Sequence, residues 1–123
     1  MSGLFLRIAP DAVTVGAGAH GFEPARLARY RAAVANPQTG AELAATTRTL
    51  ERKGIGVGGE TYVRTPRGFS ADGDRERLLR HSALHAHAEL DAALATDRQL
   101  IPTLVRHWCS SVPLHTWLIV NVS

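Results

Sequence analysis

Cysteine is nearly absent from this chain of 123 residues, in which Cys109 stands alone. A single cysteine excludes an intramolecular disulfide and a cysteine-rich zinc site. Because Cys109 follows Trp108 in an apolar segment, we expect it to be buried as a small hydrophobic residue.

Long apolar runs are also missing. No stretch approaches the roughly 18 residues that a membrane-spanning helix needs, and residues 1–7 lack the basic start and apolar centre of a signal peptide. These absences predict a soluble, cytoplasmic protein that has no membrane partner.

Lysine is scarce, since every one of the 14 basic residues except Lys53 is arginine. The net charge is only +3, and the arginines are interspersed with 11 acidic residues. This balance predicts mild attraction to anions but is too small to indicate nucleic acid, so no nucleic-acid partner is expected. The length and the apolar content of 45% predict one globular domain over residues 1–123.

Apolar residues alternate over residues 4–8 and again over 13–15, with a turn at Pro10-Asp11 between them. This pattern predicts a β-hairpin. Two strands alone are marginally stable, so we expect a further sheet partner inside or outside the chain. Residues 60–64 are the expected additional strand, after a glycine-rich loop.

Most of the remaining chain has helical spacing of its apolar residues. Thr39 with Glu42 forms a capping box that predicts a helix start, and Val112-Pro113 predicts a helix end. Residues 83–87 fit either state, and for 114–122 a helix is favoured over a strand. The fold class predicted is α+β: a small antiparallel or mixed sheet with four to six short helices packed mainly on one face. The expected helices cover residues 24–35, 39–53, 72–81, 89–95, 96–111 and 114–122.

The pattern Gly-x-Gly-x-x-Gly occurs twice, and in a dinucleotide-binding fold such glycines bring backbone amides to a pyrophosphate. The required second strand with a terminal acidic residue is missing after the first match. Tight turns and close backbone packing are therefore favoured over a nucleotide site, and no cofactor is expected. The matches are Gly16, Gly18, Gly21 and Gly54, Gly56, Gly59.

Three histidines near one another, His81, His85 and His87, are the candidate metal ligands. His81 and His85 would share a helical face, whereas His85 and His87 would share a strand face, so neither periodicity aligns all three by itself. Surface or partly buried histidines are the favoured interpretation. A metal-assisted enzyme using these residues is the weakest of our hypotheses, and no catalytic residue is assigned.

Glu60, Arg64 and Arg67 form the favoured ligand-binding group. On an extended segment Glu60 and Arg64 point to one face, where they could pair with each other. Arg67 lies between Pro66 and Gly68, on a rigid turn that presents its guanidinium to a carboxylate or phosphate at low entropic cost. For these arginines a structural role, in which the side chain ties a loop to helix carbonyls or to an acidic residue, is favoured over a ligand role.

Several segments resemble one bacterial family, the domain-of-unknown-function family 2461. The resemblance covers essentially the whole chain and includes a motif of the form basic-x-Pro-Arg-Gly-aromatic. Two positions depart from the family pattern: Val63 stands where lysine is usual, and Gly73-Asp74 replaces His-Pro. The segments that carry the resemblance are Leu4-Phe5-Leu6-Arg7-Ile8, Val15-Gly16-Ala17-Gly18 with Pro24, Glu60-Thr61-Tyr62-Val63-Arg64-Thr65-Pro66-Arg67-Gly68-Phe69, Ala71-Asp72, Leu78-Leu79, and Pro113-Leu114 with Trp117-Leu118.

This resemblance implies an α+β domain without an established activity. It also implies that an N-terminal part of the family is absent, so the first hairpin would have an exposed edge. A homodimer or a separate N-terminal partner would then complete the sheet. The leading hypothesis is a module that binds an anionic small molecule or an acidic partner segment; the alternative is a structural or interaction subunit without a ligand.

Overall fold

Within residues 3–123, which are the residues that the computed structural model describes, four strands form one antiparallel sheet with the order β1-β2-β4-β3. Strand β4 is central and pairs with β2 on one side and with β3 on the other. The first two strands form the predicted hairpin. The strands are β1 (Gly3–Ile8), β2 (Ala12–Ala19), β3 (Gly56–Glu60) and β4 (His81–Asp91).

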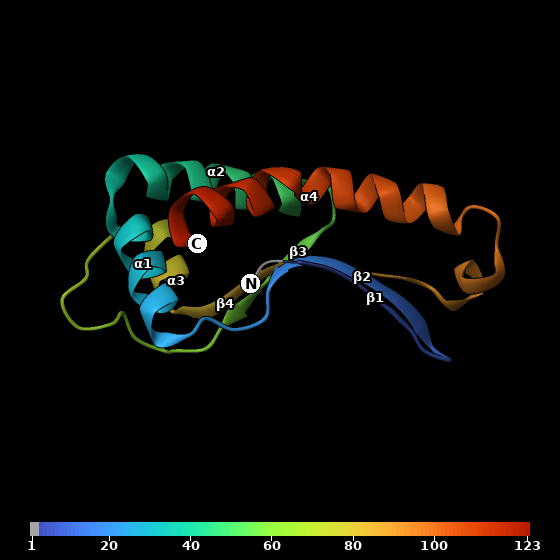
Figure 1. The fold of residues 1–123 in the computed structure, drawn as a ribbon, viewed down its shortest axis with the longest axis horizontal. Coiled ribbons are helices and arrows are strands. Elements are labelled where there is room, and N and C mark those ends of the chain that lie inside the picture. The colour runs from blue at the N-terminus through green and yellow to red at the C-terminus, as the bar shows by residue number, and fades with distance from the viewer. Residues whose placement is uncertain (1–2) are drawn as a thin grey trace.

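The helices gather on one face of this sheet, with α2 and α4 running side by side above it (Figure 1). Together with the antiparallel sheet they confirm the predicted α+β class. None of the helices in residues 3–123 combines the length and the apolar character needed to cross a bilayer. The helices are α1 (Pro24–Ala35), α2 (Pro37–Arg52), α3 (Asp74–Leu79) and α4 (Leu100–Val122), with a short 3-10 helix η1 (Ala92–Thr96).

Strand alternation decides which side chains enter the core. Successive residues of a strand point to opposite faces, and in β2 the odd-numbered residues from Val13 to Ala19 are buried towards the helices. Tyr30, Leu43, Leu79 and Leu114 from the four helices pack with Ala19 in the main core, whereas Val15 packs with Leu104 in a second cluster. The other face of the sheet carries Gly16 and Gly18 in β2 and the ring side chains described below.

The first two helices meet at Asn36-Pro37. The Asn36 side chain accepts hydrogen bonds from the backbone N–H of Gln38 (2.9 Å) and of Thr39 (3.4 Å), so Asn36 is the N-cap of α2. The predicted start at a Thr39–Glu42 capping box was therefore wrong by one turn. Thr39 instead donates through Oγ1 to the carbonyl of Ala33, which ties the two helices together.

Three further predictions about the elements were wrong. The loop expected at residues 55–59 is largely strand β3, which ends at Glu60, where a strand was expected to begin. Residues 89–91 belong to β4, not to a helix. The break expected at Val112-Pro113 is absent, since α4 continues through Pro113 to Val122. Tryptophans on both sides of Pro113 hold α4 in place, because Trp108 donates to Gly16 O (3.2 Å) and Trp117 donates to Thr39 O (2.9 Å).

Cys109 also differs from expectation. Its side chain is exposed on α4 and is not buried. The neighbouring Trp108 supplies the partly buried apolar side chain at this point of the helix.

Candidate functional site

The segment between β3 and α3, residues 61–73, contains the predicted arginines. It has no regular structure, but it is fixed at several points. The backbone N–H groups of Thr61 and Tyr62 both donate to Arg80 O (3.0 Å each). Further along, Thr65 Oγ1 donates to Glu76 Oε1 (2.8 Å), and Phe69 packs against the main core. The segment is therefore anchored before, between and after its two arginines.

Arg64 and Arg67 are both exposed on this anchored segment. Neither makes a hydrogen bond or an ion pair within the described part of the chain. Between them stands Thr65-Pro66, whose threonine is the anchor to Glu76. The two arginine side chains therefore extend from a fixed stretch of backbone, one on each side of the Thr65 anchor.

Glu60 does not join these arginines. Its carboxylate forms an ion pair with Arg80 (3.2 Å), and the same guanidinium pairs with Glu76 (3.3 Å). The expected Glu60–Arg64 pair is absent, because Arg64 lies beyond the end of β3 and no longer follows strand alternation. Glu60 therefore connects the end of β3 to α3, a structural role.

A third guanidinium lies next to the segment. Arg31 on α1 is placed over the ring of Tyr62, with 5.5 Å from Cζ to the ring centroid. This distance is within the range of a cation–π contact. The Nε atom of Arg31 is buried and has no hydrogen-bond partner in residues 3–123. The contact adds positive charge beside the segment and also helps to fix Tyr62.

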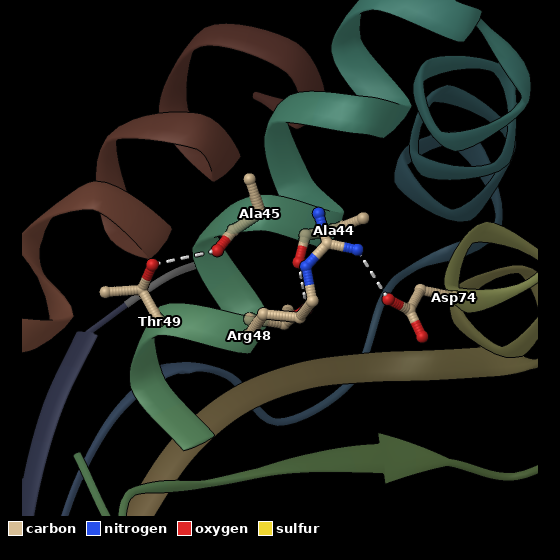
Figure 2. Close-up of polar contacts among 6 residues, drawn as sticks. Ala44, Ala45, Arg48, Thr49 and Asp74 are labelled. Carbon is tan, nitrogen blue, oxygen red and sulfur yellow. Dashed lines mark hydrogen bonds and ion pairs between the residues drawn. The ribbon is translucent and has the colours of Figure 1, made fainter. Parts of the chain in front are cut away.

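A small cleft of about 50 Å³ lies between α2, α3 and the sheet, with the buried His81 among its lining residues. Arg48 reaches across from α2 to Asp74 at the start of α3, with 2.8 Å between Nη1 and Oδ2 (Figure 2). Glu51 and Arg77 also line the cleft. Cations and carboxylates are therefore present together, so this cleft is less suited to an anion than the arginines of residues 61–73.

The open face of the sheet carries a row of four rings that the sequence did not reveal. Phe5 lies beside His20, His20 stacks on His85, and His85 lies beside His87; the successive centroid distances are 4.7, 5.5 and 5.4 Å. Burial lowers the pKa of His85, and His87 and His20 lower it further. Burial thus favours the neutral form of the His85 imidazole.

Glycines of both motifs, together with Gly58, which belongs to neither, lie beside this row. His85 is paired with Gly18 and Gly58, and His87 with Gly16 and Gly56. A Cβ atom on Gly58 would be 2.4 Å from Cε1 of His85, and one on Gly56 would be 3.1 Å from Nε2 of His87. The glycines therefore give the imidazoles room to lie against the sheet, which agrees with the predicted close packing. The sequence signal for this packing was a Gly-x-Gly spacing in two of the strands together with a His-x-His spacing in a third.

The histidines do not converge as metal ligands. His81 lies in the same strand as His85 and His87, so the helical alternative for this segment was wrong. His81 is buried, with Nδ1 3.1 Å from Ala83 O, while the Nδ1 atoms of His85 and His87 are buried without a partner in the described chain. Residues 3–123 contain no group of three or more His, Cys, Asp or Glu side chains placed to hold a metal ion.

Comparison with known proteins supports the resemblance noted in the sequence. A family model described as "Conserved hypothetical protein (DUF2461)" matches residues 1–117. No curated protein and no solved structure gave a match.

Proposed function

The chain belongs to the conserved hypothetical protein family DUF2461, whose description names no activity, and we propose from the residues themselves that it binds an anionic small molecule through Arg64 and Arg67. The ligand group is a carboxylate or a phosphate, since both match the planar donor fork of arginine. The observation that carries the proposal is the absence of an internal partner for either guanidinium in residues 3–123.

Other arginines of the same region are used within the fold. Arg48 pairs with Asp74, and Arg80 pairs with Glu60 and Glu76. Arg75 donates to the carbonyls of Val34 and Ala35, at 3.2 and 2.7 Å. Arg48, Arg75 and Arg80 thus have partners within the fold, whereas Arg64 and Arg67 have none in residues 3–123, which favours a ligand role for the latter two.

Anchoring of the segment supports binding in a second way. Ordering a mobile loop on binding costs free energy that a fixed loop does not need to supply. Thr61, Thr65 and Phe69 already hold the backbone around both arginines. Arg31 beside Tyr62 adds to the local positive potential, which favours the approach of an anion.

The test is a thermal-shift titration of the untagged chain with sodium phosphate and with sodium succinate, each matched by sodium chloride of equal ionic strength. A ligand that binds only the folded state stabilises it by about 2.7 kcal/mol at a hundredfold excess over Kd. We expect a saturable rise in melting temperature with phosphate or succinate that is reduced in Arg64→Gln and in Arg67→Gln.

Arg98→Gln is the matched control. Arg98 is an exposed arginine in the segment before α4, which lies at the opposite end of the molecule from residues 61–73 (Figure 1). This variant has the same change in charge and should keep the full response. A tetraglutamate peptide distinguishes an acidic partner segment from a small molecule as the natural ligand. If the ligand is a partner segment, the thermal response to this peptide should saturate at a lower concentration than the response to succinate.

Equal loss of response in all three variants would indicate a general charge effect and would overturn the proposal. So would a flat response of the wild type to all the anions, which is what a structural or interaction subunit predicts.

A further inference from the structure

Strand β1 has an open edge. Among residues 3–123 it pairs with β2 alone, since it is the first strand in the order β1-β2-β4-β3. Leu4, Leu6 and Ile8 lie opposite Ala17, Val15 and Val13, so they point to the helix-covered side of the sheet. They are nevertheless 58%, 40% and 56% exposed. An edge strand with a full apolar side is an unusual arrangement for a free surface.

The apolar surface continues from β1 onto α4. This helix covers β2, where Trp108 bonds to Gly16 O, and leaves β1 uncovered. A groove of about 220 Å³ lies between β1 and α4, with Leu4, Trp108, Cys109 and Val112 among its lining residues. Ile101 and Val105 extend the exposed apolar surface of α4.

Nothing in β1 opposes pairing with another strand. Natural edge strands are usually protected by lysine, proline, a bulge or an inward-pointing charge. Residues 3–8 contain only one charged residue, Arg7, and it points to the open face, away from the apolar side chains. Hydrogen-bonding groups of the outer edge are thus accessible next to an apolar surface.

We infer that a second copy of this chain covers the surface, with β1 pairing antiparallel to β1 across a two-fold axis. In an antiparallel pair, directly opposite residues point to the same face. A register centred on Leu6 places Leu6 opposite Leu6 and Leu4 opposite Ile8, all on the helix side. The same register places Arg7 opposite Phe5 on the open face, so no like charges meet.

Other registers are less complementary. Centring on Arg7 would place two arginines directly opposite each other, which is destabilising. Centring on Phe5 would leave Ile8 without an apolar partner across the axis. The register centred on Leu6 therefore joins the two sheets into one of eight strands, with Leu4, Leu6 and Ile8 of both copies in a shared apolar layer.

Sedimentation velocity over a hundredfold concentration range tests the inference. The wild type is expected to be a dimer that dissociates on dilution, and Leu6→Lys to be a monomer, because two lysines would meet at the axis. Val120→Lys is the matched control, since Val120 is 73% exposed elsewhere on α4, and it should stay dimeric. A wild type that is monomeric at every concentration, or a dimeric Leu6→Lys variant, would overturn the inference.

A cross-linking experiment gives a second readout that does not depend on the folding of the lysine variant. In a Cys109→Ser background, Leu6→Cys places the only two thiols of the dimer directly opposite each other, within reach of a disulfide. Oxidised glutathione should convert this variant to a covalent dimer, whereas Arg7→Cys in the same background should stay uncrosslinked. Equal cross-linking of both variants would rule out the register, and no cross-linking of Leu6→Cys would rule out the interface.

Discussion

At the scale of single residues, individual hydrogen bonds from large side chains connect one helix to another. Tyr30 is fully buried on α1, and its hydroxyl donates to Leu78 O at 2.7 Å. Burial raises the pKa of Tyr30 well above its usual value, so the hydroxyl stays protonated and acts as a donor. This contact joins α1 to α3, the helix that follows the segment carrying Arg64 and Arg67.

Replacing this hydroxyl should therefore destabilise the fold. Tyr30→Phe leaves the buried carbonyl of Leu78 without its partner, which costs roughly 1–2 kcal/mol. Urea denaturation measures the loss. Tyr62→Phe is the control, since Tyr62 is 42% exposed and keeps its ring beneath Arg31; it should change the free energy of unfolding by less than about 0.5 kcal/mol. Equal effects of the two substitutions would contradict the role given to Tyr30.

His81 makes the stability depend on pH. Burial lowers its pKa; Arg77 and Arg80 act in the same direction, while the hydrogen bond to Ala83 and the charge of Glu60 oppose them. A lowered pKa means that the unfolded chain binds a proton more readily than the folded chain. Stability is then complete above the unfolded value of about 6.5 and is lost as pH falls towards the folded-state value.

We therefore expect the free energy of unfolding to fall between pH 7.5 and pH 5.0, by at most about 1.4 kcal/mol per pH unit for one such group. His85 and His107 contribute in the same direction, because burial lowers the pKa of each. His81→Asn, which can keep a donor towards Ala83 O, should flatten the dependence measured by urea denaturation. An unchanged or steeper slope in His81→Asn would contradict the assignment.

Among the elements, β4 depends most on its neighbours. Its sequence is rich in alanine and histidine, residues that do not by themselves favour a strand. Pairing on both sides, with β2 and with β3, makes it the centre of the sheet. Next to it, β3 ends in an irregularity between Gly58 and Glu60, where Gly59 has φ +112°.

Gly59 should not tolerate a side chain. A Cβ atom there would lie 2.0 Å from Ala83 O, and the positive φ is strained for any other residue. Gly59→Ala is expected to cost roughly 2 kcal/mol or more of folding free energy, measured by urea denaturation. Gly21→Ala is the control because nothing lies within 4 Å of its Cβ position, and it should cost less than about 0.5 kcal/mol. A tolerated Gly59→Ala would mean that β3 ends differently.

On the scale of the whole molecule, local patterns predicted much of the architecture. Alternation predicted the β1–β2 hairpin, and Pro24 predicted the start of α1, because both are signals carried by adjacent residues. The strand state of β4 and the continuation of α4 through Pro113 could not be predicted, since both depend on contacts with distant elements.

The candidate site was predictable to a similar extent. The exposed turn around Arg67 could be predicted from Pro66 and Gly68. The separation of Glu60 from Arg64 could not, because Arg80, the residue that pairs with Glu60, lies 20 positions further along the chain (80 − 60). The ring row was hidden for the same reason, since its members come from three strands and their ends.

The central claim, that Arg64 and Arg67 bind an anion, is tested most directly by the Nε–Hε resonances of the arginines in ¹H–¹⁵N NMR spectra. Phosphate is titrated at constant ionic strength, and the two resonances are assigned from Arg64→Gln and Arg67→Gln. We predict saturable shifts of these two resonances with a common Kd, while Arg98 stays unchanged. Shifts of equal size at Arg98, or no saturable shift at Arg64 and Arg67, would contradict the claim.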